Sequence, residues 1–186
     1  MMHIMRNTKH NVRAAAKEAS HERIVSVAAR AIRRSGYDGT GVADIMKEAG
    51  LTHGAFYAHF ESREAMLAEA ANRAPACPPS RLWHPCFAPI SREHLVHVEM
   101  GCPLAALGSE TPRQAPEVRR ATTRHVKQMI DLVARQSPDW GQPGAHERAL
   151  VTVATMAGTL LLARAVDEPA LSDSLYAAAL KHLPPA

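Results

Sequence analysis

The chain has 186 residues, of which 46% are hydrophobic and 22% are charged, and its formal net charge is +4. This composition is that of a soluble globular protein with one large domain or two small ones. Its three cysteines form no disulfide framework and no signal peptide precedes them, so we expect a reduced, cytoplasmic protein. The longest apolar run, residues 149–163, holds three threonines and is too short for a membrane span, so no membrane contact is predicted.

Positive charge is concentrated at the N-terminus. Residues 1–34 contain eight Lys or Arg side chains and two glutamates, a local net charge of +6. This asymmetry favours a polyanion partner, although a solvated tail would have the same composition. Residues 1–19 lack apolar periodicity and are predicted to form a flexible basic arm.

Four short helices are predicted after the arm, because apolar residues recur there every three or four positions. Ser20 is the expected N-cap of the first, which Gly36 ends. The second covers residues 42–49 and stops at a glycine. Thr52 and Ser62 are placed to cap the third and fourth through their hydroxyls, and the fourth runs to about residue 73.

A break follows, since five prolines between residues 74 and 92 rule out a continuous helix. A domain boundary is therefore predicted near residue 73, with residues 74–186 forming a second helical domain. Its helices are expected around 104–110, over 116–136, over 146–166 and over 171–182, with a Pro/Gly loop at 137–144.

The third predicted helix has a polar and aromatic face at its start. A helix N-terminus carries partial positive charge and free N–H groups, so Thr52, His53 and Gly54 can bind a phosphate. A short helix that follows another at a steep angle can enter the major groove, where Tyr57 offers a rigid ring and a hydroxyl. The predicted DNA-binding residues are Thr40, Thr52, His53, Gly54, Tyr57, His59 and Arg63.

The residues around this face follow a recognisable order. Residues 36–40 read G-Y-D-G-T, 49–50 read A-G, 52–60 read T-H-G-A-F-Y-A-H-F and 62–64 read S-R-E. Over about residues 20–70 the chain thus resembles the helix-turn-helix of the TetR family of transcriptional repressors. Two departures are Arg63, where a lysine is usual, and Gly41, where a Ser or Thr commonly caps the second helix.

The resemblance implies an all-α protein with an N-terminal three-helix DNA-binding domain, residues 20–73, and a C-terminal helical dimerisation and ligand-binding domain, residues 74–186. It implies a repressor that binds a palindromic operator as a homodimer and is released by a small-molecule or reactive inducer. Phe56 and Phe60 match the family's core positions. The last two helices, rich in Ala, Leu and Val, would form a four-helix dimer interface, unless they pack only within the chain.

The inducer site is less defined in the sequence. Apolar residues such as Leu107, Val126, Met129, Ile130 and Met156 are candidates to line a pocket, although such residues more often fill a core. Cys102 precedes a short helix whose N-terminus would lower the thiol pKa, which makes it a candidate redox sensor; a buried, inert cysteine is the alternative.

A group of Cys and His residues lies between positions 77 and 97, but its spacing matches no zinc motif, so no metal or cofactor is predicted. Without a nucleophile–base pair the chain is not expected to be an enzyme. Two alternatives remain: a ligand-independent DNA-binding dimer with a degenerate sensor domain, and a zinc- or thiol-dependent enzyme that uses this group. Its members are Cys77, His84, Cys86, His94 and His97.

Overall fold

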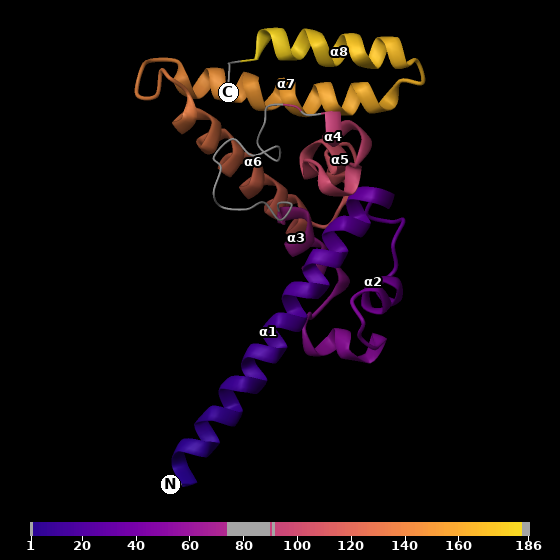
Figure 1. The fold of residues 1–186 in the computed structure, drawn as a ribbon, viewed down its shortest axis with the longest axis vertical. Helices are drawn as coiled ribbons and strands as arrows, with labels where there is room; N and C mark the ends of the chain where they lie inside the picture. The colour runs from indigo at the N-terminus through magenta and orange to yellow at the C-terminus, as the bar shows by residue number, and fades with distance from the viewer. Residues whose placement is uncertain (1, 74–89, 91, 184–186) are drawn as a thin grey trace.

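The computed structural model describes residues 2–73, 90 and 92–183, and within these it is helical and contains no strand, which confirms the all-α prediction. The first helix runs to one end of an elongated molecule and the last two helices lie across the other end, while the helix before them leads there from the middle (Figure 1). The Pro-rich break predicted at 74–92 lies largely outside the described residues. In chain order the elements are α1 (Met2–Ser35), α2 (Val42–Glu48), η1 (His53–Ala58), α3 (Arg63–Asn72), α4 (Arg92–Val96), η2 (Val98–Met100), α5 (Pro103–Leu107), η3 (Thr111–Arg113), α6 (Pro116–Gln136), α7 (Ala145–Ala165) and α8 (Pro169–His182).

The predicted start of the first helix at Ser20 is wrong, because α1 is continuous from Met2. The hydroxyl of Ser20 donates to the carbonyl of Ala16 at 3.0 Å, one turn back, instead of capping a helix. Residues 11–19 are exposed, so burial does not account for this helix. Ala, Arg, Lys and Glu dominate the segment and have high helix propensity. The prediction depended on apolar periodicity, which indicates which side of a helix is buried. It does not detect an exposed helix that forms through high helix propensity.

Of the N-caps predicted at Thr52 and Ser62, the structure has only the second. The hydroxyl of Ser62 accepts a hydrogen bond from the backbone N–H of Ala65 at 3.0 Å, which confirms it as the N-cap of α3. Thr52 occupies the N-cap position of η1 but makes no side-chain capping bond, so that prediction is wrong. Gly50 ends α2 with a φ of +69°, as expected for a glycine stop.

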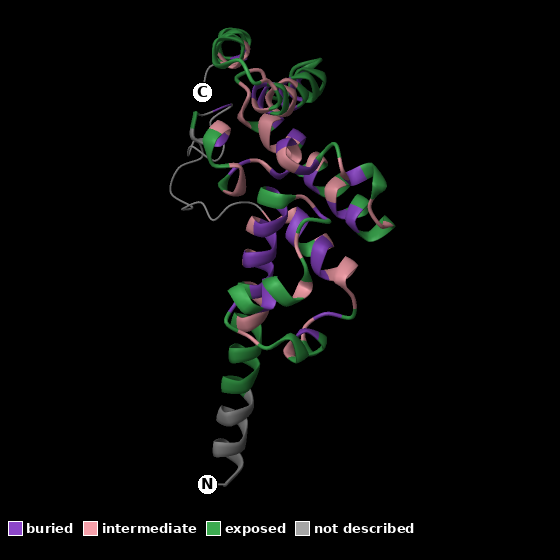
Figure 2. Cartoon of the chain, turned by 90° about the vertical axis from the view of Figure 1, so that its right-hand side faces the viewer, coloured by how far each residue is buried: buried purple, intermediate pink, exposed green. Residues whose placement is uncertain are grey.

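The core of the N-terminal half is one large cluster of buried side chains from α1, α2, η1 and α3. Phe56 and Phe60 lie in it with their rings stacked 5.5 Å apart, which agrees with their predicted core positions. Leu107 and Val118 join the same cluster from α5 and α6. The purple residues of Figure 2 follow this core up the inner side of α1. The N-terminal half is therefore packed directly on elements that follow residue 92.

Arg33 is buried within this junction, although the sequence placed it among the cations available to a polyanion. Its Nε donates to the carbonyl of Glu99 at 2.7 Å and its Nη1 to the carbonyl of Arg73 at 3.0 Å. Burial lowers the pKa of its guanidinium to about 10. Arg30 and Arg34 also have a partner, since both pair with Glu48.

The C-terminal helices α6, α7 and α8 begin and end within two residues of their predicted bounds, while α4 and η2 were not predicted. Their buried side chains form two smaller clusters among the described residues. Within that part of the chain, α7 alone is long and apolar enough to cross a membrane, and only 28% of its apolar window is buried. One such helix is weak support for a membrane segment, because core helices of soluble proteins have the same length and composition.

Candidate nucleic-acid interface

The start of η1 forms an exposed rim made of Thr52, His53, Gly54 and Tyr57. The side chain of Tyr57 is 72% exposed, while that of the neighbouring Phe56 is 3% exposed and lies in the core. The two rings meet edge to face at 5.3 Å, so the buried ring supports the exposed one. The structure thus brings four of the seven predicted DNA-binding residues together on one surface.

Gly54 is not required by the fold of this chain. A Cβ built at this position would have no heavy atom within 4 Å, and the backbone φ is not positive. Glycine also costs helix stability relative to alanine. Open space in front of an exposed glycine allows the backbone of a partner to approach closely, as a phosphate contact requires.

His59 is oriented differently from the exposed rim. Its ring lies 6.0 Å from the ring of His21 on α1, and its Nδ1 is buried without a hydrogen-bond partner. Burial lowers the pKa of His59, and the nearby His21 and Lys17 lower it further. In this structure His59 is therefore a neutral part of the contact between η1 and α1, and the rim does not include it.

His21 holds η1 and α3 against α1, a role that the sequence did not suggest. Its ring stacks on Phe60 at 4.5 Å, and its Nε2 lies 2.7 Å from a carboxylate oxygen of Glu69. The only signal in the sequence was its position three residues before Ile24, on the same side of the helix. Through these two contacts, His21 helps to fix the orientation of the rim relative to α1.

Arg63 and Thr40 lie beside the rim. A guanidinium nitrogen of Arg63 donates to the carbonyl of Tyr37 in the turn after α1, so this side chain braces the helix-turn-helix. Thr40 is half-buried in the loop that leads into α2. Both were predicted to contact DNA, which stays a prediction.

The turn at Tyr37 is also tied to the C-terminal half. The backbone N–H of Tyr37 donates to a carboxylate oxygen of Glu110 at 2.9 Å, and its phenol oxygen lies 3.5 Å from the hydroxyl of Thr111. A Cβ at Gly36, whose φ is +76°, would lie 2.7 Å from the Glu110 carboxylate, so only glycine fits there. Elements at α5 and η3 thus hold the turn that precedes the DNA-reading helices.

The four predicted sensor residues are not brought together. Leu107 lies in the N-terminal core, Met129 packs against the cluster around Ile130, and Cys102 and Met156 pack against a third cluster. Of the two states considered for Cys102, the buried, inert one is favoured: burial raises the pKa of its thiol, and this outweighs the N–H groups of α5 and the charges of Arg33 and Arg164.

The Cys and His group considered for zinc is only partly described. Cys77, His84 and Cys86 lie outside the described residues, while His94 is buried on α4 and His97 is exposed. Across the residues that the structure describes, no group of three or more His, Cys, Asp or Glu side chains could hold a metal ion.

A groove with a volume of about 660 Å³ lies between α5, η3, α6 and α7, and two of the apolar residues considered for a pocket, Val126 and Ile130, line it. The groove is lined mainly by apolar side chains, and Arg119 and Lys127 from α6 also line it. Neither cation is paired with a carboxylate in the described part of the chain. The residues that line it are Leu104, Gly108, Thr111, Pro112, Arg119, Thr122, Thr123, Val126, Lys127, Ile130, Leu150, Val153, Ala154 and Ala157.

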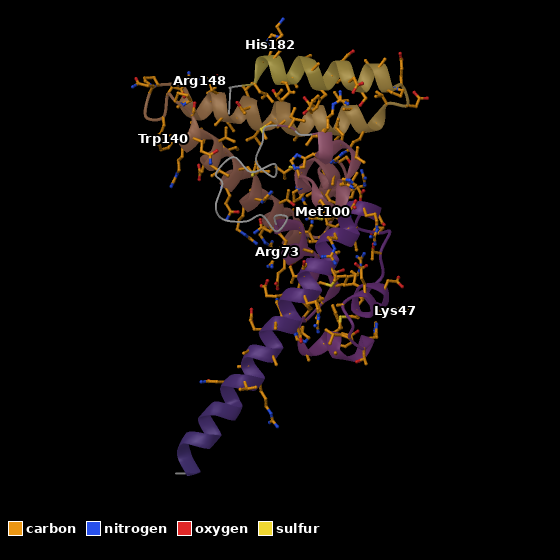
Figure 3. All side chains as sticks on the ribbon, viewed as in Figure 1. Lys47, Arg73, Met100, Trp140, Arg148 and His182 are labelled. Atoms are coloured by element: carbon orange, nitrogen blue, oxygen red, sulfur yellow. The ribbon has the colours of Figure 1, made fainter. Side chains whose placement is uncertain are left out.

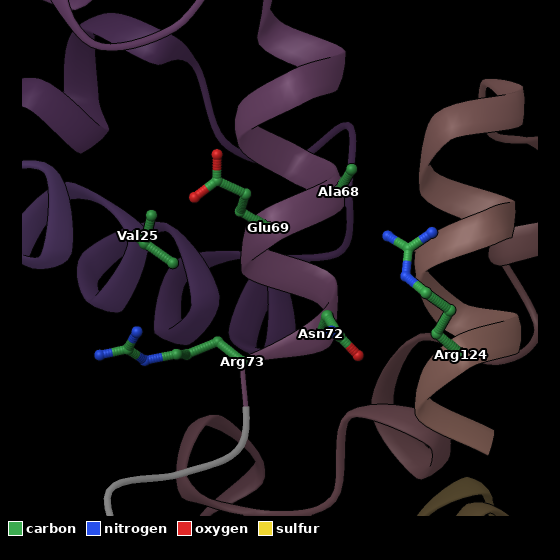
Figure 4. Close-up of a pocket in the computed structure, with 6 residues that line it drawn as sticks. All are labelled: Val25, Ala68, Glu69, Asn72, Arg73 and Arg124. Atoms are coloured by element: carbon green, nitrogen blue, oxygen red, sulfur yellow. The ribbon is translucent and has the colours of Figure 1, made fainter. Parts of the chain in front are cut away.

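A smaller and more polar pocket of about 320 Å³ lies between α1, α3 and α6. In Figure 4, Arg124 on α6 faces Ala68 and Asn72 on α3 across it. The Oδ1 of Asn72 is buried there without a hydrogen-bond partner. This pocket and the larger groove both border α6, the helix against which α3 packs most extensively.

Comparison with known proteins supports the resemblance on independent grounds. Residues 24–70 match the family model of bacterial regulatory proteins of the tetR family. HTH-type transcriptional regulator Rv0196 of Mycobacterium tuberculosis is 28% identical to the chain, with 79% of this chain and 85% of the relative covered. HTH-type transcriptional regulator LmrA of Bacillus subtilis is 27% identical, with 77% and 85% covered.

Solved structures share the fold. A TetR transcriptional regulator from Chloroflexus aurantiacus superposes with a TM-score of 0.65 at 24% identity, covering 90% of this chain and 96% of the other. The reduced form of E. coli NemR gives the same TM-score at 19% identity, covering 90% and 99%. The exposed rim thus lies within a segment that matches the tetR family model, and the chain is similar along most of its length to HTH-type transcriptional regulators and shares the fold of TetR regulators.

Proposed function

We propose that this regulator is a cytoplasmic, non-enzymatic repressor that binds a palindromic operator as a homodimer and leaves it when a small molecule binds. The observation that carries the proposal is the exposed rim of Thr52, His53, Gly54 and Tyr57, at a short helix that is anchored in the core by Phe56. A single rim reads one half-site, so useful affinity requires two copies with matched spacing. The domain division at residue 73 belongs to this proposal.

The proposed dimer interface is formed by α7 and α8. Large apolar side chains stay exposed on these helices within the chain, and such patches mark interaction sites. A Cβ built at Gly158 on α7 would have no heavy atom within 4 Å, which leaves room for a partner helix. The exposed apolar residues there are Leu150, Val151, Leu161, Leu162, Leu171 and Leu180.

The inducer site that we propose is the groove between α5, η3, α6 and α7, in place of the four residues taken from the sequence. Its apolar floor suits an apolar body, and the unpaired charges of Arg119 and Lys127 suit an acidic group on the same molecule. The predicted ligand class is therefore an amphipathic carboxylate or a similar anion.

The route from this groove to DNA runs through η3. Thr111 lines the groove, and its hydroxyl donates to the carbonyl of Leu107 at 2.9 Å while it lies beside the phenol of Tyr37. Glu110 holds the backbone of the same turn. A ligand that prefers a displaced η3 would move the turn and change the spacing of the two rims, with a coupling of about 1–3 kcal/mol.

The test starts from the full chain and DNA selected from a random library. Tyr57→Ala should abolish retardation of the selected operator while the thermal unfolding midpoint stays unchanged, because Tyr57 is exposed. Gly54→Ala should also weaken binding without loss of stability, since a Cβ there meets only the partner. The matched control is Trp140→Ala, an exposed aromatic in the loop between α6 and α7, far from α2 and its labelled Lys47 (Figure 3). Operator binding that survives Tyr57→Ala would contradict the proposed surface.

One observation favours a second function, a ligand-independent repressor: the predicted sensor residues lie in three separate clusters. Arg119→Ala together with Lys127→Ala separates the two cases. In the ligand-responsive case medium-chain fatty acids release the operator from the native chain and not from the variant. If no carboxylate in such a series changes operator affinity, the ligand-independent function is the one that stands.

A further inference from the structure

The N-terminal part of α1 extends beyond the body of the protein. In Figure 1 it passes the level of α2 and projects away from α7 and α8. Residues 2–19 form about five turns of helix with a length of about 27 Å, and residues 11–19 are exposed along their whole length. This exposed stretch needs no partner within the chain, which leaves its surface available to another molecule.

The basic residues of this extension fall on one face. Arg6, Lys9, Arg13 and Lys17 are separated by three, four and four residues, the spacing that places positions above one another on a helix. His21 comes four residues after Lys17 and continues the same face. We call the four Arg and Lys positions the basic stripe.

The stripe leads to the DNA-reading helix. His21, one turn further on, stacks on Phe60 and contacts Glu69, so this face of α1 is the one that packs on η1 and α3. Lys17 is close enough to His59 that its charge acts on that imidazole. The stripe therefore extends the surface of η1 and does not lie behind it.

The charges at the inner end of the stripe are not used within the chain. Arg13 and Lys17 have no carboxylate partner in the described residues, whereas Arg30, Arg34 and Arg73 each pair with a glutamate. The sequence holds one acidic residue, at position 18, among positions 2–21, and it is turned by about 100° from Lys17. The inner end of the stripe thus offers two unneutralised cations on a preformed helix.

We propose that the basic stripe is a second DNA-binding surface, which contacts the phosphates that flank the segment read by η1. A row of cations on an exposed helix is complementary to the phosphates of a duplex, and such contacts set affinity and register without reading sequence. The extension is longer than the roughly 12 Å width of the major groove, so it reaches phosphates beyond those near the rim. This inference rests on operator binding through η1.

The experiment compares three full-length proteins on the selected operator across a series of salt concentrations. The first is the native chain and the second carries Arg13→Ala and Lys17→Ala. The third carries these changes with Ala15→Arg and Ala19→Lys, which restores the charge on the opposite face of the same helix. Circular dichroism checks that the helix content of all three is equal.

The slope of log affinity against log salt should fall by about 0.9 for each cation removed, and hence by about 1.8 per chain, in both variants. Hydroxyl-radical footprints should shorten at the flanks of the operator while the central protection stays. A native slope in the second protein, or recovery of the slope in the third, would overturn the basic stripe. Failure of the native chain to retard any selected DNA would instead overturn the proposed function. Tyr57→Ala keeps the two outcomes apart, because it should abolish retardation of the operator, whereas the stripe variants should only weaken binding and lower its salt slope.

Discussion

The N-terminal unit, α1 to α3, and the C-terminal helices, α6 to α8, bury their side chains to very different extents. In the first, apolar residues from every helix meet in one cluster, and Leu67 is 1% exposed. In the second the clusters are small, and Leu150 and Leu162 on α7 are 43% and 50% exposed. The N-terminal unit is complete within one chain, whereas the C-terminal helices leave apolar surface for a partner.

The largest expected effect tests the first half of this comparison. Leu67→Ala removes a fully buried side chain and should lower the free energy of unfolding by about 2–5 kcal/mol, because the core cannot collapse onto the cavity. Chemical denaturation followed by circular dichroism measures this. Val12→Ala, at an exposed position of α1, is the control and should change the free energy by less than about 0.5 kcal/mol. Equal effects of the two would mean that the N-terminal core is not the stabilising unit.

The second prediction tests the other half. Val151→Ala combined with Leu162→Ala removes four large apolar side chains from a two-fold interface and should raise the dimer dissociation constant by at least about 100-fold. Sedimentation velocity over a range of concentrations gives that constant. Val96→Ala, at a more exposed apolar position on α4, should leave it unchanged. A dimer that survives both changes would place the interface elsewhere.

A smaller effect separates two caps that look alike in the sequence. Ser62→Ala should cost about 1 kcal/mol of stability, because the hydroxyl satisfies the N–H of Ala65 at the start of α3. Thr52→Ala should cost less than about 0.5 kcal/mol, since Thr52 makes no capping bond, and yet it should weaken operator binding. Thermal unfolding and gel retardation on the same samples measure both. Similar losses of stability in the two variants would contradict the assignment of Thr52 to the DNA surface.

The same division explains what could be predicted from the sequence. The helices of the N-terminal unit, its core positions Phe56 and Phe60 and the exposed rim were predictable, because local spacing decides which side of a short helix is buried. The extension of α1 was missed, since high helix propensity without burial leaves no periodic signal. The groove depends on how α6 lies against α7 and η3, a tertiary arrangement that no residue spacing encodes. The sequence left two states open for Cys102 for a related reason: the pKa of a thiol depends on its burial by segments distant in the chain.

The smallest effect concerns two histidines, one in each region. Burial lowers the pKa of His125 on α6 below its usual 6.5, with Arg33 lowering it further, and burial also lowers that of His59. Below pH 6.5 the unfolded chain therefore binds protons that the folded chain does not, so the free energy of unfolding must fall as the pH drops from 7 towards 5. His125→Asn should flatten this dependence more than His59→Asn does, since His125 is buried and His59 is only half-buried. His146→Asn, at an exposed position, is the control for denaturation curves taken across this range. A larger flattening from His59→Asn would mean that the contact between η1 and α1 is the more pH-sensitive of the two regions. The N-terminal unit would then be well packed in its apolar core but not in its polar contacts.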